Sequence, residues 1–145
     1  YAKSVGALTI AVTCCPGCEA EAHADVAISP APGPEVITGS TRMKSGTAQK
    51  MILNMLSTGV MVKLGKVYGN LMVDVKASNE KLRERCVRIV RQATGEEDAA
   101  ARAALIDTNY ACKPAIVMLL LGVDKTRAET LLTRANGRVA AAREG

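Results

Sequence analysis

Two short runs of apolar and β-branched residues open the chain, at residues 7–13 (Ala-Leu-Thr-Ile-Ala-Val-Thr) and 25–29 (Asp-Val-Ala-Ile-Ser). Runs of this kind are typical of strands buried on both faces of a parallel sheet. A short helix is expected over residues 19–24, between the two strands, and completes a βαβ unit. Two strands are too few for a free-standing sheet, so we expect the rest of the sheet to lie upstream of Tyr1.

A long apolar pattern with helical spacing comes next. It is preceded by residues 30–34 (Pro-Ala-Pro-Gly-Pro), which form a stiff loop because each proline restricts itself and the residue before it. The helix is expected to begin near Thr41 and to end at Gly65. Its predicted buried face consists of small and flexible apolar residues spaced three or four apart: Ala48, Met51, Ile52, Met55, Leu56 and Gly59.

The remaining residues are predicted to be mainly helical, after one extended stretch. Residues 67–75 are expected to be extended, with a turn at Gly69-Asn70. Ser78 is expected to cap a helix that ends at Gly95. Shorter helices are predicted over residues 96–107, 112–121 and 124–135, with a last turn after Gly137.

Composition and charge narrow the class of protein. The sequence has no Phe or Trp, so its core is expected to be aliphatic and Met-rich, and stacking on nucleic-acid bases is nearly excluded. The basic excess lies wholly in residues 61–145, but without a recognisable nucleic-acid module we expect no nucleic-acid partner. No apolar run approaches the ~20 residues that a membrane span needs, and no signal peptide opens the chain. A cytoplasmic protein without membrane contact is therefore expected.

The loop before the long helix carries the first candidate binding site. Ser40 or Thr41 stands where an N-cap belongs, and Arg42 and Lys44 fall in the first turn. Cations are unfavourable there because the helix dipole already makes that end positive. Two hydroxyls and two cations beside free amides indicate a bound anion, usually phosphate, although a solvated basic loop is the alternative. Glu35 could orient a sugar hydroxyl or Arg42, or could only fix the loop.

The stretch from Gly33 to Lys50 also resembles the signature of the N-acetylmuramic acid 6-phosphate etherases and their relatives, the glucokinase regulatory proteins. The resemblance continues through residues 69–82 (Gly-Asn-Leu-Met-Val-Asp-Val-Lys-Ala-Ser-Asn-Glu-Lys-Leu) and more loosely to the end, with the etherase branch closer. It implies an α/β fold of the sugar isomerase (SIS) type. Residues 1–65 would form the C-terminal half of a three-layer αβα SIS domain with a parallel sheet, residues 66–95 a connecting stretch and lid-like helix, and residues 96–145 a small all-α module of the ubiquitin-associated (UBA) type.

The activity implied by the resemblance is that of a carbon–oxygen lyase without a cofactor. Such an etherase removes the D-lactyl group from N-acetylmuramic acid 6-phosphate and yields N-acetylglucosamine 6-phosphate and D-lactate, in cell-wall sugar recycling. A carboxylate base removes the C2 proton, an acid helps lactate to leave from C3, and water adds back. Two alternatives on the same fold are a non-catalytic sugar-phosphate sensor and a sugar-phosphate isomerase. A homodimer is expected, because SIS-fold sites usually form where two subunits meet.

The resemblance also implies a second group of binding residues. Asn79, Lys81 and Leu82 match an Asn-x-Lys-Leu stretch that reaches onto the sugar phosphate in the regulatory-protein relatives, and Arg85 fits one turn further on. From spacing alone, these residues would be a solvated helix face. The acid–base glutamates of the etherases belong to the first half of the SIS domain. This segment is therefore expected to contribute ligand contacts, a lid and a dimer surface, and no catalytic residue.

The cysteines and the single histidine offer further candidates. Cys15-Pro-Gly-Cys18 has the spacing of the redox-active CxxC of thioredoxin-like folds, but no aromatic residue precedes it and reduced thiols are expected. A zinc site is not expected, because Cys14, Cys15 and Cys18 lack a fourth ligand at a finger-like spacing. His23 has polar neighbours and is interpreted as a surface residue.

Overall fold

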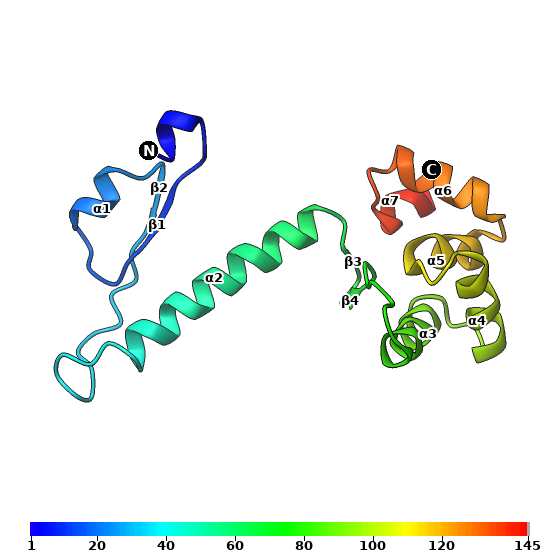
Figure 1. Ribbon diagram of the computed structural model, residues 1–145, viewed down its shortest axis with the longest axis horizontal. Helices are drawn as coiled ribbons and strands as arrows, with labels where there is room; N and C mark the ends of the chain where they lie inside the picture. The colour runs from blue at the N-terminus through cyan, green and yellow to red at the C-terminus, as the bar shows by residue number, and fades with distance from the viewer. Residues whose placement is uncertain (145) are drawn as a thin grey trace. The chain divides into compact units, whose positions relative to one another are not determined.

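The computed structural model describes residues 1–144, and the chain forms two compact units, Tyr1–Thr58 and the part from Gly59 onward. The fold is mixed α/β, mostly helical with a small parallel sheet, so the expected fold class is confirmed at this level (Figure 1). It is compatible with part of a SIS domain. No helix within residues 1–144 combines the length and apolar character that a membrane crossing requires.

The first unit begins with a βαβ arrangement, as the sequence predicts. A 3₁₀ turn, η1 (Lys3–Val5), precedes strand β1 (Ile10–Val12), helix α1 (Glu19–Ala22) and strand β2 (Val26–Ile28). Strands β1 and β2 pair in parallel with Ala11 opposite Ala27. The Asp25 carboxylate fastens this pair because it accepts hydrogen bonds from the Thr9 amide at 2.8 Å and the Thr9 hydroxyl at 2.7 Å.

The long helix α2 (Lys44–Lys63) begins three residues later than the sequence predicts, so the expected start near Thr41 is wrong. Its predicted end is confirmed: Gly65 adopts a left-handed φ of 69°. The Gly65 amide donates to the Val62 carbonyl at 3.0 Å and the Lys66 amide to the Met61 carbonyl at 3.1 Å, which is a Schellman motif.

The predicted buried face of α2 is not buried in this chain. Met51 is 58% exposed and Met55 is 60% exposed. No residue is buried in the range Tyr1–Thr58, all of which the structure describes. Ala48, Ile52 and Leu56 are only half-buried. Helical periodicity shows which residues favour an apolar contact, but the first unit contains too few elements to provide one.

The second unit has a hairpin followed by five helices. Strands β3 (Val67–Tyr68) and β4 (Leu71–Met72) pair antiparallel across the predicted Gly69-Asn70 turn. The helices are α3 (Glu80–Thr94), α4 (Asp98–Asp107), α5 (Cys112–Leu121), α6 (Lys125–Arg134) and α7 (Val139–Glu144).

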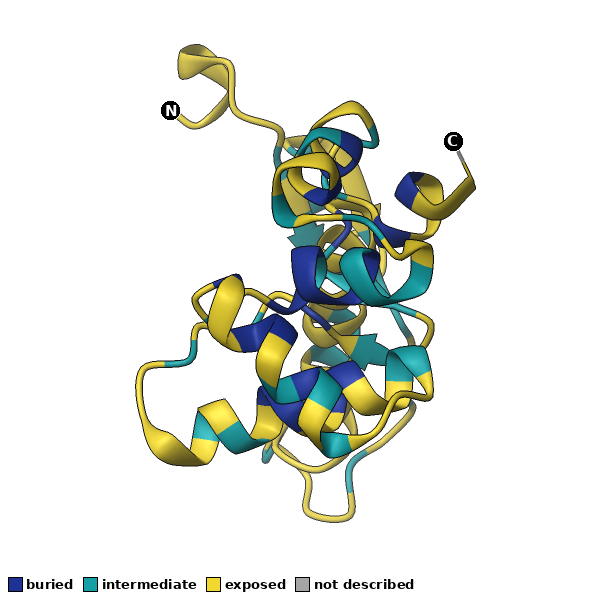
Figure 2. Cartoon of the chain, turned by 90° about the vertical axis from the view of Figure 1, so that its right-hand side faces the viewer, coloured by how far each residue is buried: buried dark blue, intermediate teal, exposed yellow. Residues whose placement is uncertain are grey.

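Helix α5 is the centre of the second unit. Its sequence, Cys-Lys-Pro-Ala-Ile-Val-Met-Leu-Leu-Leu, is apolar on nearly every side, and such a helix favours burial all round. Accordingly α5 packs against α3, α4, α6 and α7, and the buried residues are concentrated on these helices (Figures 1 and 2). Cys86 of α3 and Cys112 of α5 lie side by side in this core, where burial and the neighbouring thiol raise the pKa of Cys112.

Helix α3 is part of this core. It packs on α4 and α5 in one continuous cluster of buried residues. The division between the two compact units falls after Thr58, inside α2. The predicted division into residues 1–65, 66–95 and 96–145 stays a prediction. The assignment of residues 96–145 to a UBA-type module stays a prediction.

Candidate functional site

The loop before α2 is closed by the Glu35 carboxylate. Its two oxygens accept hydrogen bonds from the backbone amides of Lys44 and Ser45, each at 3.0 Å. These amides belong to the first turn of α2, which has no intrahelical partners for them, and the helix dipole favours a negative charge there. The two backbone hydrogen bonds, that from Lys44 first, lower the pKa of Glu35. Glu35 is therefore an ionised helix cap.

This contact corrects the expected geometry of the anion site. Ser40 and Thr41 do not cap the helix: they lie in the preceding turn, where the Ser40 amide donates to the Ile37 carbonyl and the Thr41 carbonyl accepts from the Gly46 amide. The Glu35 carboxylate offsets the positive end of the helix. The binding of a phosphate by this loop stays a prediction. The side chains of Arg42 and Lys44 are exposed and form no ion pair within residues 1–144.

The cysteine-rich turn lies against the same helix start. The Cys14 thiol is 3.6 Å from the Ser45 carbonyl oxygen, and the Cys18 thiol is 3.7 Å from the Thr13 hydroxyl. All five cysteines are free thiols. No group of His, Cys, Asp or Glu in the described part of the chain could hold a metal ion. His23 lies at the end of α1, exposed, 3.5 Å from Glu19.

The second candidate site lies on α3 beside the β3–β4 hairpin. A hollow of about 540 Å³ is lined by the basic side chains of Lys81, Arg85 and Arg88. None of the three has an ion-pair partner in the described part of the chain. The other lining residues come from the hairpin and from the same face of α3: Asn70, Leu71, Met72, Ile89 and Gln92.

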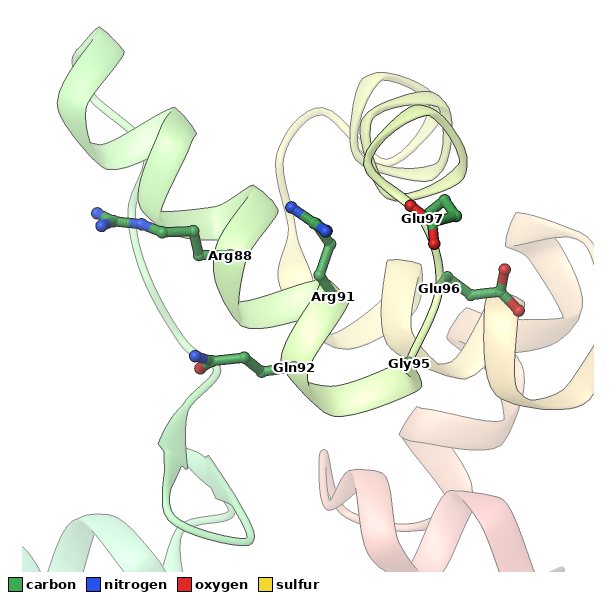
Figure 3. Close-up of a pocket in the computed structure, with 6 residues that line it drawn as sticks. All are labelled: Arg88, Arg91, Gln92, Gly95, Glu96 and Glu97. Atoms are coloured by element: carbon green, nitrogen blue, oxygen red, sulfur yellow. The ribbon is translucent and has the colours of Figure 1, made fainter.

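The two remaining basic residues of α3 have partners inside the helical unit. Arg83 lies over the Tyr110 ring at 5.2 Å from its centroid, and Arg91 lies 3.5 Å from the Asp98 carboxylate. In Figure 3, Arg88 and Gln92 extend from one side of α3, and Arg91 extends from another. Two cations of α3 thus contact other residues of the helical unit, and the other three share one hollow.

Asn79 starts this helix and corrects the predicted cap. Its side-chain oxygen accepts a hydrogen bond from the Leu82 amide at 2.9 Å, so Asn79 and not Ser78 is the N-cap of α3. The Asn79 side-chain NH₂ makes no hydrogen bond within residues 1–144. It remains able to donate to a ligand.

Lys81 and Arg85 are predicted site residues, whereas Arg88, Gln92 and Asn70 are not among the predicted site residues. Positions 81, 85, 88 and 92 are spaced by four, three and four, which places them on one face of a helix. That spacing is a usable signal. What the spacing does not reveal is that the hairpin lies beside this face and closes the hollow.

The carboxylates near this site have structural contacts. The Arg102 guanidinium donates to both oxygens of Glu84, at 2.7 and 2.8 Å, and these hydrogen bonds lower the pKa of Glu84. Arg102 also donates to Asp98. Asp74, which follows β4, pairs with Lys66 and lies 3.8 Å from Lys113, and these contacts lower its pKa. These acids therefore join α3 to α4 and the hairpin segment to α5.

Comparison with known proteins shows first that the region around α3 is similar to a known domain family. The sequence model of a family described as the C-terminal lid domain of glucokinase regulatory protein matches residues 69–116. This range contains the hairpin from Gly69 onward, α3, α4 and half of α5, and it includes every residue of the hollow.

Individual relatives extend the similarity to nearly the whole chain. The chain is 56% identical over 142 residues to the N-acetylmuramic acid 6-phosphate etherase of Caldanaerobacter subterraneus (98% of this chain, 46% of the relative) and to that of Serratia proteamaculans (98% and 48%). It is 55% identical over 139 residues to the etherase of Clostridium botulinum (96% and 46%). The resemblance found in the sequence is confirmed. The chain spans about half the length of the curated relatives it matches.

Proposed function

We propose that this chain is part of an N-acetylmuramic acid 6-phosphate etherase that acts in the cytoplasm, in cell-wall amino sugar recycling. The observation that carries the proposal is the identity of 55–56% to relatives of that name across 96–98% of the chain. The reaction is a carbon–oxygen lyase step that converts N-acetylmuramic acid 6-phosphate and water into N-acetylglucosamine 6-phosphate and D-lactate.

In this proposal, the chain binds the substrate and does not supply the acid and base. The Lys44 and Ser45 amides hold the Glu35 carboxylate at the helix start, and the lowered pKa of Glu35 makes it a poor proton donor. Its role would be to fix the loop that carries Ser40, Thr41, Arg42 and Lys44, whose side chains would contact the sugar phosphate.

Asn79, Lys81 and Arg85 would contact the sugar phosphate from α3. Support comes from the free NH₂ group of Asn79 and from the hollow that Lys81 and Arg85 share. The match to a family described as a lid domain agrees with a lid role for this part of the chain.

The exposed apolar residues of the first unit support a larger assembly. Helix α2 has apolar side chains on all sides and no buried residue, and such a helix is expected to be surrounded in the complete protein. We infer that residues 1–65 are the C-terminal half of a SIS domain and that the complete protein is a homodimer. Sedimentation of the full-length protein at about ten to a hundred micromolar should show a dimer, and a monodisperse monomer would contradict this inference.

The activity is tested by incubating the full-length protein with N-acetylmuramic acid 6-phosphate and assaying D-lactate. Release of lactate is expected, and its absence with a folded protein would reject the etherase. The second candidate, a non-catalytic sugar-phosphate sensor, is favoured by the match to the lid domain of a regulatory protein. A sensor would bind the sugar phosphate and release no lactate, and an isomerase would instead form a ketose phosphate.

The binding role of the α2 loop has its own test. Arg42→Ala and Lys44→Ala should each weaken sugar-phosphate binding by about 1.5–3 kcal/mol, the range for a hydrogen bond to a charged group. Stability should stay the same or rise slightly, because a cation is removed from the positive end of a helix. Unchanged affinity in both variants would reject the role of this loop.

A further inference from the structure

The hollow on α3 combines positive charge with an apolar wall. Arg85 and Arg88 lie one turn apart on α3, and Gln92 follows Arg88 by another turn. Leu71 and Met72 of the hairpin line the same hollow. The site thus offers two unpaired guanidinium groups, an amide and an aliphatic surface within about 540 Å³.

This combination suits a small carboxylate that carries an alkyl group. A guanidinium presents a planar fork of donors that matches the two oxygens of a carboxylate. The apolar side chains beside it favour a ligand that brings a methyl group along with its charge. A phosphate would use the cations but would leave Leu71 and Met72 facing a fully polar ligand.

We propose that Arg85 and Arg88 bind the carboxylate of the D-lactyl group, with its methyl group against Leu71 and Met72. The inference rests on the proposed function, whose substrate carries a phosphate and a carboxylate as separate anions. The contact of Arg85 with the sugar phosphate is then made to its lactyl carboxylate, while Lys81, at the beginning of the helix, contacts its phosphate group. The hollow then distinguishes the substrate from the product N-acetylglucosamine 6-phosphate, because the product has lost its carboxylate.

The test compares ligands with and without the carboxylate on the full-length protein. Arg88→Gln should raise the KM for N-acetylmuramic acid 6-phosphate by about ten- to a hundredfold, the factor expected for a lost hydrogen bond to a charged group. The inhibition constant of N-acetylglucosamine 6-phosphate should stay within about twofold, because that ligand has no carboxylate for Arg85 and Arg88 to bind. Gln92→Glu should act in the same direction, since it places a negative charge beside Arg88.

Arg83→Gln is the matched control. It removes the same charge from the same helix, but Arg83 lies over Tyr110 and does not line the hollow. The KM for N-acetylmuramic acid 6-phosphate and the inhibition constant of N-acetylglucosamine 6-phosphate should both stay near the wild-type values in this variant. Circular dichroism of each variant shows whether α3 is intact. Calorimetry with N-acetylmuramic acid, which has the carboxylate and no phosphate, should show weaker binding to Arg88→Gln than to the Arg83→Gln control.

The outcomes separate this inference from the proposed function. If Arg88→Gln weakens the binding of both ligands equally, the hollow binds phosphate. If the binding of neither ligand changes, the hollow binds no part of the substrate. Either result overturns the inference while lactate release by the wild-type protein keeps the etherase. If the wild-type protein releases no lactate, the proposed function fails instead.

Discussion

Asn79 caps α3 and is proposed to donate a hydrogen bond to the ligand, and two substitutions separate these roles. Its side-chain oxygen caps α3 through the Leu82 amide at 2.9 Å, while its NH₂ group has no partner in the described part of the chain. Asn79→Ala removes both groups. Asn79→Asp keeps the capping oxygen and removes the NH₂ group.

The loss of the cap sets the size of the stability effect. Replacing an N-cap Asn by Ala costs about 1 kcal/mol, within a range of about 0.5–2 kcal/mol. Because α3 is part of the continuous core of the second unit, that loss should appear in the cooperative unfolding of its helices. In a unit of this size, about 1 kcal/mol corresponds to a lower Tm by about 4–8 °C. Asn79→Asp should remain within a few tenths of a kcal/mol of wild type, because Asp and Asn are comparable N-caps.

The assay is urea unfolding followed by circular dichroism, paired with sugar-phosphate binding to the full-length protein. Asn79→Asp should be stable and yet bind the phosphate more weakly, by about tenfold or more, because it replaces a donor by a negative charge. An Asn79→Ala variant as stable as wild type would refute the capping argument. Unchanged affinity in Asn79→Asp would show that the NH₂ group does not contact the ligand.

Three further predictions concern the second unit. Gly65→Ala should lower the free energy of unfolding, measured by urea unfolding, by at least about 1–2 kcal/mol. The reason is that φ of Gly65 is 69° and that an added Cβ would lie 2.8 Å from Arg138 Cγ. Thr108→Val should cost about 1 kcal/mol in the same assay, since the buried hydroxyl donates to a backbone carbonyl. The hydrogen bond from Lys66 is the chief reason why the pKa of Asp74 in the folded state lies below its ordinary value of 3.8. Asp74 therefore contributes to the free energy of unfolding above pH 3.8, and this contribution is lost as the pH falls through the folded-state pKa. Stability below about pH 4 should therefore fall more steeply in wild type than in Asp74→Asn. Equal slopes would contradict this.

The sequence predicts best where one residue type determines the local backbone. Helix α5 has its predicted bounds, Cys112–Leu121, because its apolar run is followed by Gly122 in the left-handed conformation. The βαβ unit and the turn at Gly69-Asn70 are also confirmed, because short apolar runs separated by turn residues leave few alternatives.

The predictions fail where a contact depends on distant parts of the chain. Glu35 caps α2 from nine residues upstream of Lys44, and no local sequence pattern predicts a hydrogen bond over that separation. The predicted buried face of α2 assumed neighbouring elements that the first unit does not contain. Arg88 gains its place in a candidate site only because the hairpin packs beside α3.

The paired thiols of Cys86 and Cys112 make the stability of the helical unit chemically measurable. They are 0% and 1% exposed, so an alkylating reagent can reach them only when α3 and α5 separate. Cys14, Cys15 and Cys18 are half-buried or exposed in the first unit and should react at once. Mass spectrometry after timed alkylation would then record three fast additions followed by two slow ones. The rate of the slow pair reports how often the core opens under native conditions, without any denaturant.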